Sequence, residues 1–277
     1  TARMNNISTY IKQRLSLREP LAEALDVLTK LVDKLSLSKP DKQENKEAEE
    51  AEYKEYLENQ LQSIKEVCPS CRDFERDFPS FAFSIATGIG KTRLMGACIA
   101  YLYLTKGIKH FFILAPNLTL YEKLMRDFGD PSYEKYVFKG ISEFVHNEPY
   151  VITGDNYNMA RNLFSENQIQ INIFNISKFN TESKEGGKKG APKMRRLSEY
   201  LGQSYFDYLS SLDDLVILMD EAHRYHADAS KKAINELRPI LGLEMTATPT
   251  DEKGKAFKNI VYEYNLCLLY TSPSPRD

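Results

Sequence analysis

One stretch of the sequence has the residue types and spacing of a loop that binds phosphate groups. An apolar run ends at Ile85, and a helix-like segment begins near Lys91 and Thr92. Gly88 and Gly90 allow the backbone to bend, so that consecutive N–H groups converge on phosphate oxygens at a helix N-terminus. Lys91 can then reach β- and γ-phosphates, and the Thr92 hydroxyl can bind Mg²⁺. The residues expected to hold the phosphates are Thr87, Gly88, Ile89, Gly90, Lys91 and Thr92.

This loop differs at one position from the strict pattern, which has a glycine six positions before the lysine. The chain has Ile85 there. A glycine-rich turn that binds no ligand is the alternative interpretation. The predicted strand before the loop and the predicted helix after it favour phosphate binding, because such a loop requires both.

A second run ends in two acidic residues. Residues 215–223 read Leu-Val-Ile-Leu-Met-Asp-Glu-Ala-His, which predicts an apolar strand that ends at Asp220 and Glu221. Parallel strands bind ligands at their carboxyl edge, so both acids are expected beside the phosphate loop. Asp220 would hold Mg²⁺ through water, and Glu221 would orient and deprotonate an attacking water. The alternative is an exposed turn at a strand end.

Short apolar runs separated by helical segments must position these side chains. Several runs are apolar throughout, as expected for strands that helices cover on both faces. The predicted strands are Phe81–Ile85, Phe111–Ala115, Tyr150–Thr153, Ile169–Phe174, Leu215–Asp220, Leu241–Met245 and Ile260–Tyr264. The predicted fold class is therefore α/β, with a mainly parallel sheet and helices on both faces.

The N-terminal part of the chain is predicted to be helical. Apolar residues recur there at spacings of three and four, which places them on one buried face of a helix that Pro40 ends. They are Leu21, Leu25, Leu28, Val32 and Leu35. Glu and Lys dominate from Asp41 to Asn59, and a later apolar stripe indicates a solvated helix that docks against the main domain. The stripe consists of Tyr53, Tyr56, Leu57, Leu61 and Ile64.

Composition places the chain among ordinary globular proteins. It has 277 residues, of which 42% are hydrophobic and 27% charged, and its net charge is −2. These values exclude a wholly disordered or collagen-like chain. No apolar run approaches the roughly 18 residues of a membrane span, and the N-terminus lacks a signal-peptide pattern, so we expect a cytoplasmic protein. A nucleic-acid partner would need a local basic surface.

A basic, glycine-rich segment lies between Ser177 and Arg196. A solvated insertion is its first interpretation, and a contact with a nucleic-acid backbone is the alternative. Cys68 and Cys71 have the spacing of half a zinc site, whereas a closed site needs four ligands. We therefore expect a reduced pair and no stoichiometric zinc, with a distorted or intermolecular metal site as the alternative.

Three of these runs together resemble nucleotide-binding motifs of superfamily-two helicases in their DEAH-box form. They are Ala86–Thr92, Asp220–His223 and Thr246–Thr248. Phe112–Asn117 is similar to motif Ia of that superfamily, a strand and loop that touches the nucleic-acid backbone. The phosphate loop and the Asp-Glu-Ala-His-Arg-Tyr run most resemble the restriction subunit of type III restriction–modification enzymes and related phage-defence proteins. The resemblance covers about Ser80 to Asn265 as one RecA-like lobe of the P-loop NTPase class.

The resemblance implies ATP and Mg²⁺ as cofactors. Lys91, Asp220 and Glu221 would be the catalytic residues, and Thr92 and Asp220 would be the metal ligands. The superfamily usually reads adenine with a glutamine shortly after an arginine. The segment Leu17–Leu21 ends in leucine where that glutamine is expected. Selectivity for adenine therefore stays open.

The resemblance also implies a link between nucleotide and nucleic acid. His223, Thr246 and Thr248 would couple the nucleotide state to the grip on nucleic acid, and Pro116 and Asn117 would contact the nucleic acid. Taken alone, the threonines could equally hydrogen-bond a turn, and His223 could be an interior histidine.

The leading hypothesis is the first motor lobe of an ATP-dependent DNA helicase or translocase. Its partners would be double-stranded DNA and a modification methyltransferase subunit, and no membrane. Two alternatives stay open: a nucleotide- or DNA-binding module without turnover, and an RNA helicase lobe. An arginine-finger motif and a nuclease motif elsewhere in the intact gene would favour the first hypothesis.

We expect three segments: a helical segment 1–74, a RecA-like lobe 75–266 and a non-native tail 267–277. The tail resembles the in-frame translation of a transposase adapter used to prepare sequencing libraries; a natural Pro-rich end is the alternative. A complete motor of this superfamily has two lobes, and 29 residues follow Thr248. Since the second lobe supplies an arginine finger, we expect this chain to hydrolyse at most traces of ATP.

Overall fold

The computed structural model describes residues 2–154, 156, 167–175, 202–226 and 228–265. The basic segment 177–196 and the adapter-like tail 267–277 lie outside the described residues. None of the described helices combines the length and the apolar run that a bilayer crossing needs.

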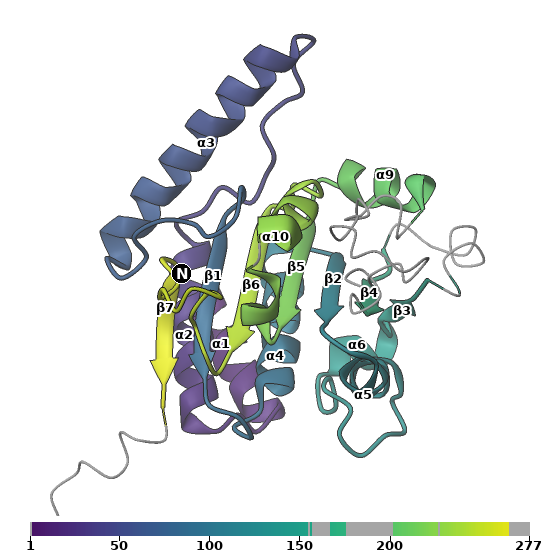
Figure 1. The fold of residues 1–277 in the computed structure, drawn as a ribbon. Helices are drawn as coiled ribbons and strands as arrows, with labels where there is room; N and C mark the ends of the chain where they lie inside the picture. The colour runs from purple at the N-terminus through teal and green to yellow at the C-terminus, as the bar shows by residue number, and fades with distance from the viewer. Residues whose placement is uncertain (1, 155, 157–166, 176–201, 227, 266–277) are drawn as a thin grey trace, which may run out of the picture.

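A parallel sheet forms the centre of the molecule (Figure 1). Its strands are β1 (Ser80–Ile85), β2 (His110–Ala115), β3 (Tyr150–Ile152), β4 (Gln170–Asn175), β5 (Leu215–Asp220), β6 (Leu241–Thr246) and β7 (Ile260–Tyr264). Their order is β3-β4-β2-β5-β6-β1-β7, and every pairing between neighbours is parallel. All seven predicted strands are thereby confirmed to within one residue at each end, as is the α/β class.

Helices cover both faces of this sheet, as predicted. Strand β5 is apolar from Leu215 to Met219, and its alternate side chains enter two separate hydrophobic clusters: Val216 and Leu218 in one, Ile217 and Met219 in the other. The first cluster includes residues of α1 (Ala2–Arg14), α2 (Glu19–Val32), α4 (Lys91–Lys106), α5 (Leu118–Gly129) and α6 (Ser142–His146). The second includes residues of α9 (Gln203–Ser211), the 3₁₀ turn η2 (Ala222–Tyr225) and α10 (Asp228–Asn235).

Helix α4 explains why the N-terminal helices are needed. Its residues from Leu94 to Leu102 are all buried, so it is apolar on every side. The sheet covers one side, and α1 and α2 pack on α4 from the other. The predicted stripe of α2 is confirmed, because Leu21, Leu25, Leu28 and Val32 are buried. The helix ends at Val32 rather than near Pro40, so that Leu35 lies beyond it and is only partly buried.

The charged segment forms helix α3 (Lys46–Val67), which extends away from the sheet in Figure 1. It begins at Lys46 because the Asn45 side chain caps it and accepts a hydrogen bond from the Glu47 N–H at 2.9 Å. The predicted docking is confirmed through Tyr53 and Ile64, which are buried. The Arg238 guanidinium lies 4.4 Å from the centre of the Tyr53 ring.

Candidate nucleotide-binding site

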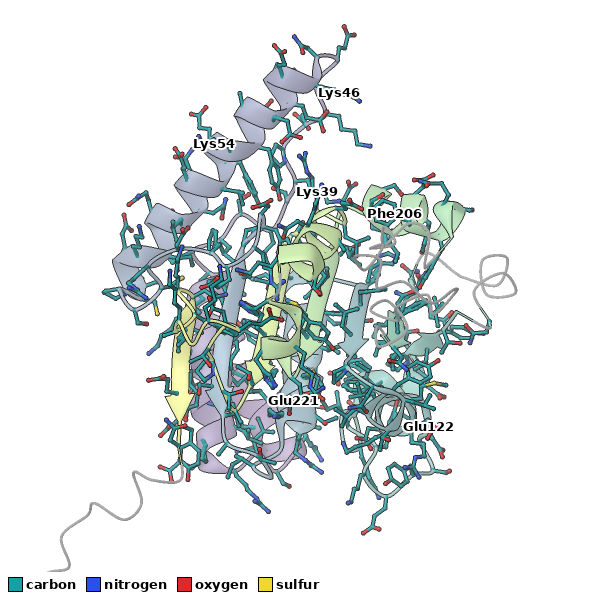
Figure 2. The ribbon with its side chains drawn as sticks, viewed as in Figure 1. Lys39, Lys46, Lys54, Glu122, Phe206 and Glu221 are labelled. Carbon is teal, nitrogen blue, oxygen red and sulfur yellow. The ribbon has the colours of Figure 1, made fainter. Side chains whose placement is uncertain are left out.

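Four loops meet at the carboxyl edge of the sheet, since all strands run in the same direction. They follow β1, β2, β5 and β6, and they contain the predicted site residues. Figure 2 shows Glu221 at this edge, with Lys39 and Phe206 near the opposite end of the strands. Strand β6 separates β1 from β5 in the sheet, so side chains from both strand ends face one shared space.

The phosphate loop has the backbone that the sequence predicted. Gly88 and Gly90 have φ angles of +83° and +116°, a region that side chains disfavour. Gly90 caps the N-terminus of α4, and a Cβ there would lie 3.2 Å from the Leu21 side chain. Lys91 and Thr92 open the helix. Ile85, where the strict pattern has glycine, is instead a fully buried end of β1 that pairs with β7.

The acidic pair lies against the phosphate loop. The Lys91 ammonium forms an ion pair with the Glu221 carboxylate, which joins the loop after β1 to the loop after β5. Asp220 is 5% exposed, and burial raises the pKa of its carboxyl, an effect that the nearby Lys91 charge opposes. A buried carboxylate needs compensating positive charge. This site can supply that charge as Lys91 or as a bound cation.

Glu221 has an unusual backbone conformation. Its φ and ψ angles are 51° and 50°, in the left-handed region that costs a residue other than glycine about 1–3 kcal/mol. Its N–H donates to Asp220 Oδ1 at 3.0 Å, and its carbonyl accepts from the Arg224 N–H at 3.0 Å. In this conformation the Glu221 carboxylate pairs with Lys91. No sequence pattern predicts it.

His223 and Thr246 are in direct contact, which connects the turn after β5 to the end of β6. His223 Nδ1 lies 2.9 Å from Thr246 Oγ1 and 3.5 Å from Glu221 Oε2. Burial lowers the pKa of His223, so its ring is neutral at pH 7. Thr246 Oγ1 also accepts a hydrogen bond from the Thr248 N–H at 3.0 Å. Thr246 therefore makes two contacts, one to the turn through the Thr248 N–H and one to the acidic motif through His223.

A buried network that was not predicted from the sequence connects β6 to η2, to the segment before β1 and to the segment before β7. Glu244 Oε1 accepts hydrogen bonds from Arg76 at 2.8 Å and lies 2.9 Å from His226 Nε2, while its Oε2 accepts from Asn259 at 2.7 Å. Arg76 also donates to the Tyr225 carbonyl at 2.8 Å. Paired charges lower the pKa of the Glu244 carboxyl to about 2, against the effect of its burial.

The turn after β2 contains the two residues predicted to contact nucleic acid, Pro116 and Asn117. A residue that contacts nucleic acid must be accessible, and the first of the two is not. Pro116 is buried, and the Asn117 side chain caps α5 by accepting from the Leu120 N–H at 2.9 Å. Leu118 is 55% exposed, and Thr119 is exposed as well. Contact of Pro116 and Asn117 with nucleic acid stays a prediction.

The cysteine pair lies at a distance from this site. Cys68 ends α3, and its carbonyl accepts a hydrogen bond from the Cys71 N–H at 3.1 Å. Burial raises the pKa of the Cys71 thiol to about 12, which keeps it protonated at neutral pH. In the described part of the chain, no three His, Cys, Asp or Glu side chains lie together as a metal cluster.

The residues present fit a nucleotide with Mg²⁺. Mg²⁺ in proteins is held by one or two carboxylates together with phosphate oxygens and water. The Thr92 hydroxyl and the Asp220 carboxylate supply such ligands beside the left-handed glycines of a phosphate loop. The Lys91 ammonium supplies the charge that phosphates require.

The fold and the site define a RecA-like lobe, in which a phosphate loop after β1 faces an Asp-Glu pair after β5. The family model described as type III restriction enzyme, res subunit, matches residues 31–251, and the chain belongs to this family. It is 26% identical over 199 residues to the probable type III restriction-modification enzyme HindVIP Res subunit of Haemophilus influenzae. The aligned part is 68% of this chain and 34% of that protein, so the chain spans about a third of the length of this relative.

Proposed function

We propose that the chain is the first motor lobe of an ATP-dependent DNA helicase or translocase of a type III restriction or phage-defence system. The observation that carries this proposal is the ion pair between Lys91 and Glu221, which brings the phosphate loop and the acidic motif into one site. The contact between His223 and Thr246 also connects this site to the end of β6.

Each residue then has a role in hydrolysis. The loop Thr87–Gly90 wraps the phosphates with its backbone N–H groups, and Lys91 leaves Glu221 to bind the β- and γ-phosphates. Thr92 and Asp220 would hold Mg²⁺, which when bound would polarise the phosphate oxygens. Glu221, released from Lys91, orients the attacking water and accepts its proton. Lys91 thus exchanges Glu221 for phosphate as its partner, and Glu221 becomes free to act as the base only when phosphate is bound.

The partners follow from the family. We propose double-stranded DNA as the track and a modification methyltransferase as a partner subunit, because the related Haemophilus protein is described as the Res subunit of a restriction-modification enzyme. RNA as the track is the competing outcome. It would be indicated if RNA, and not duplex DNA, stimulated ATP hydrolysis by the full-length protein that contains this lobe.

Nucleotide binding tests the proposal first. In Lys91→Ala we expect Mg²⁺-ATP affinity to fall about 10- to 100-fold, because hydrogen bonds to charged groups contribute roughly 1.5–3 kcal/mol. Isothermal titration calorimetry on the 277-residue chain measures the change. The matched control is Lys106→Ala at the other end of α4, where the lysine pairs with Asp33 on the surface. Equal affinity in the wild type and Lys91→Ala would refute the assignment.

A further inference from the structure

Lys123 reaches the metal side of the site from a neighbouring helix. It lies on α5, and its ammonium donates a hydrogen bond to Thr92 Oγ1 at 3.1 Å. The same ammonium forms an ion pair with Asp127, one turn further along α5. The Thr92 oxygen is the one expected to bind Mg²⁺, so the Lys123 ammonium occupies an atom that the metal ion would need.

The two cations cannot use this oxygen together. Mg²⁺ requires its ligands at about 2.0–2.1 Å in a nearly ideal octahedron. An ammonium group bound to the same hydroxyl would lie close to the metal ion, and like charges at such a distance repel strongly. The Lys123 charge also acts on Asp220, where it favours the ionised carboxyl. Lys123 therefore acts on both residues expected to bind the metal, on Thr92 through a hydrogen bond and on Asp220 through its charge.

Asp127 remains a partner for the Lys123 ammonium when the hydrogen bond to Thr92 breaks. Its side chain is 44% exposed, whereas the Asp127 side chain is 3% exposed. Asp127 can hold the ammonium on α5 after the bond to Thr92 breaks. The helix that carries both residues begins at Leu118, five residues before Lys123 and directly after the predicted nucleic-acid turn at Pro116 and Asn117.

We propose that Lys123 is a positioning residue that competes with Mg²⁺ for the Thr92 hydroxyl and so makes α5 sensitive to the metal site. This inference rests on the proposed nucleotide binding. Magnesium binding with nucleotide releases Lys123 from Thr92, and α5 loses a link to α4. Lys123 thus lowers the affinity for Mg²⁺ while leaving the phosphate loop itself unaltered.

The test is a magnesium titration of the chain saturated with ADP, followed by calorimetry. In Lys123→Met, which keeps most of the aliphatic stem but removes the charge, we expect Mg²⁺ to bind about 3- to 10-fold more tightly. ADP affinity in EDTA should stay within twofold of the wild type. Lys123→Arg keeps the positive charge and should bind Mg²⁺ as weakly as the wild type does. The matched control is Arg126→Met, which removes a cation from α5 that lies over the Tyr133 ring instead.

Two further measurements keep the result unambiguous. Lys123→Met leaves the Asp127 carboxylate without its cation, so Lys123→Met/Asp127→Asn is titrated in parallel and should show the same tightening. Amide hydrogen exchange of residues 118–124 should increase with Mg²⁺-ADP in the wild type and not in Lys123→Met.

Unchanged Mg²⁺ affinity in both variants would overturn the inference, and so would loss of ADP binding in EDTA, which would make Lys123 a phosphate ligand. These outcomes differ from failure of the proposed function, in which the wild-type chain itself binds no nucleotide and Lys91→Ala has no effect.

Discussion

Replacement of Glu221 by glutamine is expected to stop ATP hydrolysis while ATP binding persists. A positioned general base contributes about 10²- to 10⁴-fold in rate, and an amide can orient water but cannot accept its proton. The structure adds a reason for preserved binding. Glu221 pairs with Lys91, so the neutral glutamine holds that lysine less strongly and leaves it free for the phosphates.

On the proposal that this chain is one lobe of a two-lobed motor, the measurement is ATP turnover by the two-lobed protein, with and without duplex DNA. Calorimetry of Mg²⁺-ATP binding accompanies it. Asp220→Ala is the comparison, because it should weaken binding only when Mg²⁺ is present. If both variants lost binding and turnover to the same extent, the separate roles given to the two acids would be wrong. Thermal unfolding of each variant checks that the strained backbone at Glu221 survives the substitution.

The sheet could be predicted from the sequence because its strands are short, apolar and bounded by breaks in the pattern. Leu215–Asp220 shows why: every residue is buried, and both faces pack against helices, so apolar character alone marks the strand. The phosphate loop was also predictable, since its chemistry depends on local backbone geometry at Gly88 and Gly90. Local rules were sufficient in both places.

The rest of the site depends on contacts between residues far apart in the chain. Lys123 reaches Thr92 across 31 positions, and Arg76 reaches Glu244 across 168. A polar residue within an apolar strand, such as Glu244 in β6, was the one available signal for the buried network. Its partners come from separate segments, so only the folded chain shows that the charge is paired. The position of α1 likewise depends on a contact between distant segments, because this helix packs on α4.

The buried network leads to the second large effect, on stability. In Glu244→Ala we expect the free energy of unfolding to fall by about 3–5 kcal/mol, because Arg76 is left as an uncompensated buried charge. Both side chains of this pair are 0% exposed. The control is Glu50→Ala at the α3 surface, where the Glu50 side chain is 66% exposed and its pair with Arg238 should contribute at most about 1 kcal/mol. Urea unfolding followed by circular dichroism measures both.

The same residue predicts how stability depends on acid. The pKa of the Glu244 carboxyl is about 2 in the folded chain and near its ordinary value of 4.5 in the unfolded chain. A group whose pKa is lowered by folding stabilises the protein above the unfolded value, and this contribution is lost as the pH falls toward the folded value. Wild-type stability should therefore drop by about 3 kcal/mol from this carboxyl alone between pH 4.5 and pH 2.

Glu244→Gln separates this charge from the packing of the side chain. Glutamine keeps the size of glutamate, and its amide oxygen can still accept from Arg76, while its NH2 group faces the Asn259 Nδ2 donor. Glutamine does not titrate in this range. The variant should be less stable than the wild type at pH 7, and the difference between the two should shrink toward pH 2. A constant difference across this range would show that Glu244 acts through shape and hydrogen bonding. In that case the charge would not be what holds η2 to β6 beneath the acidic motif.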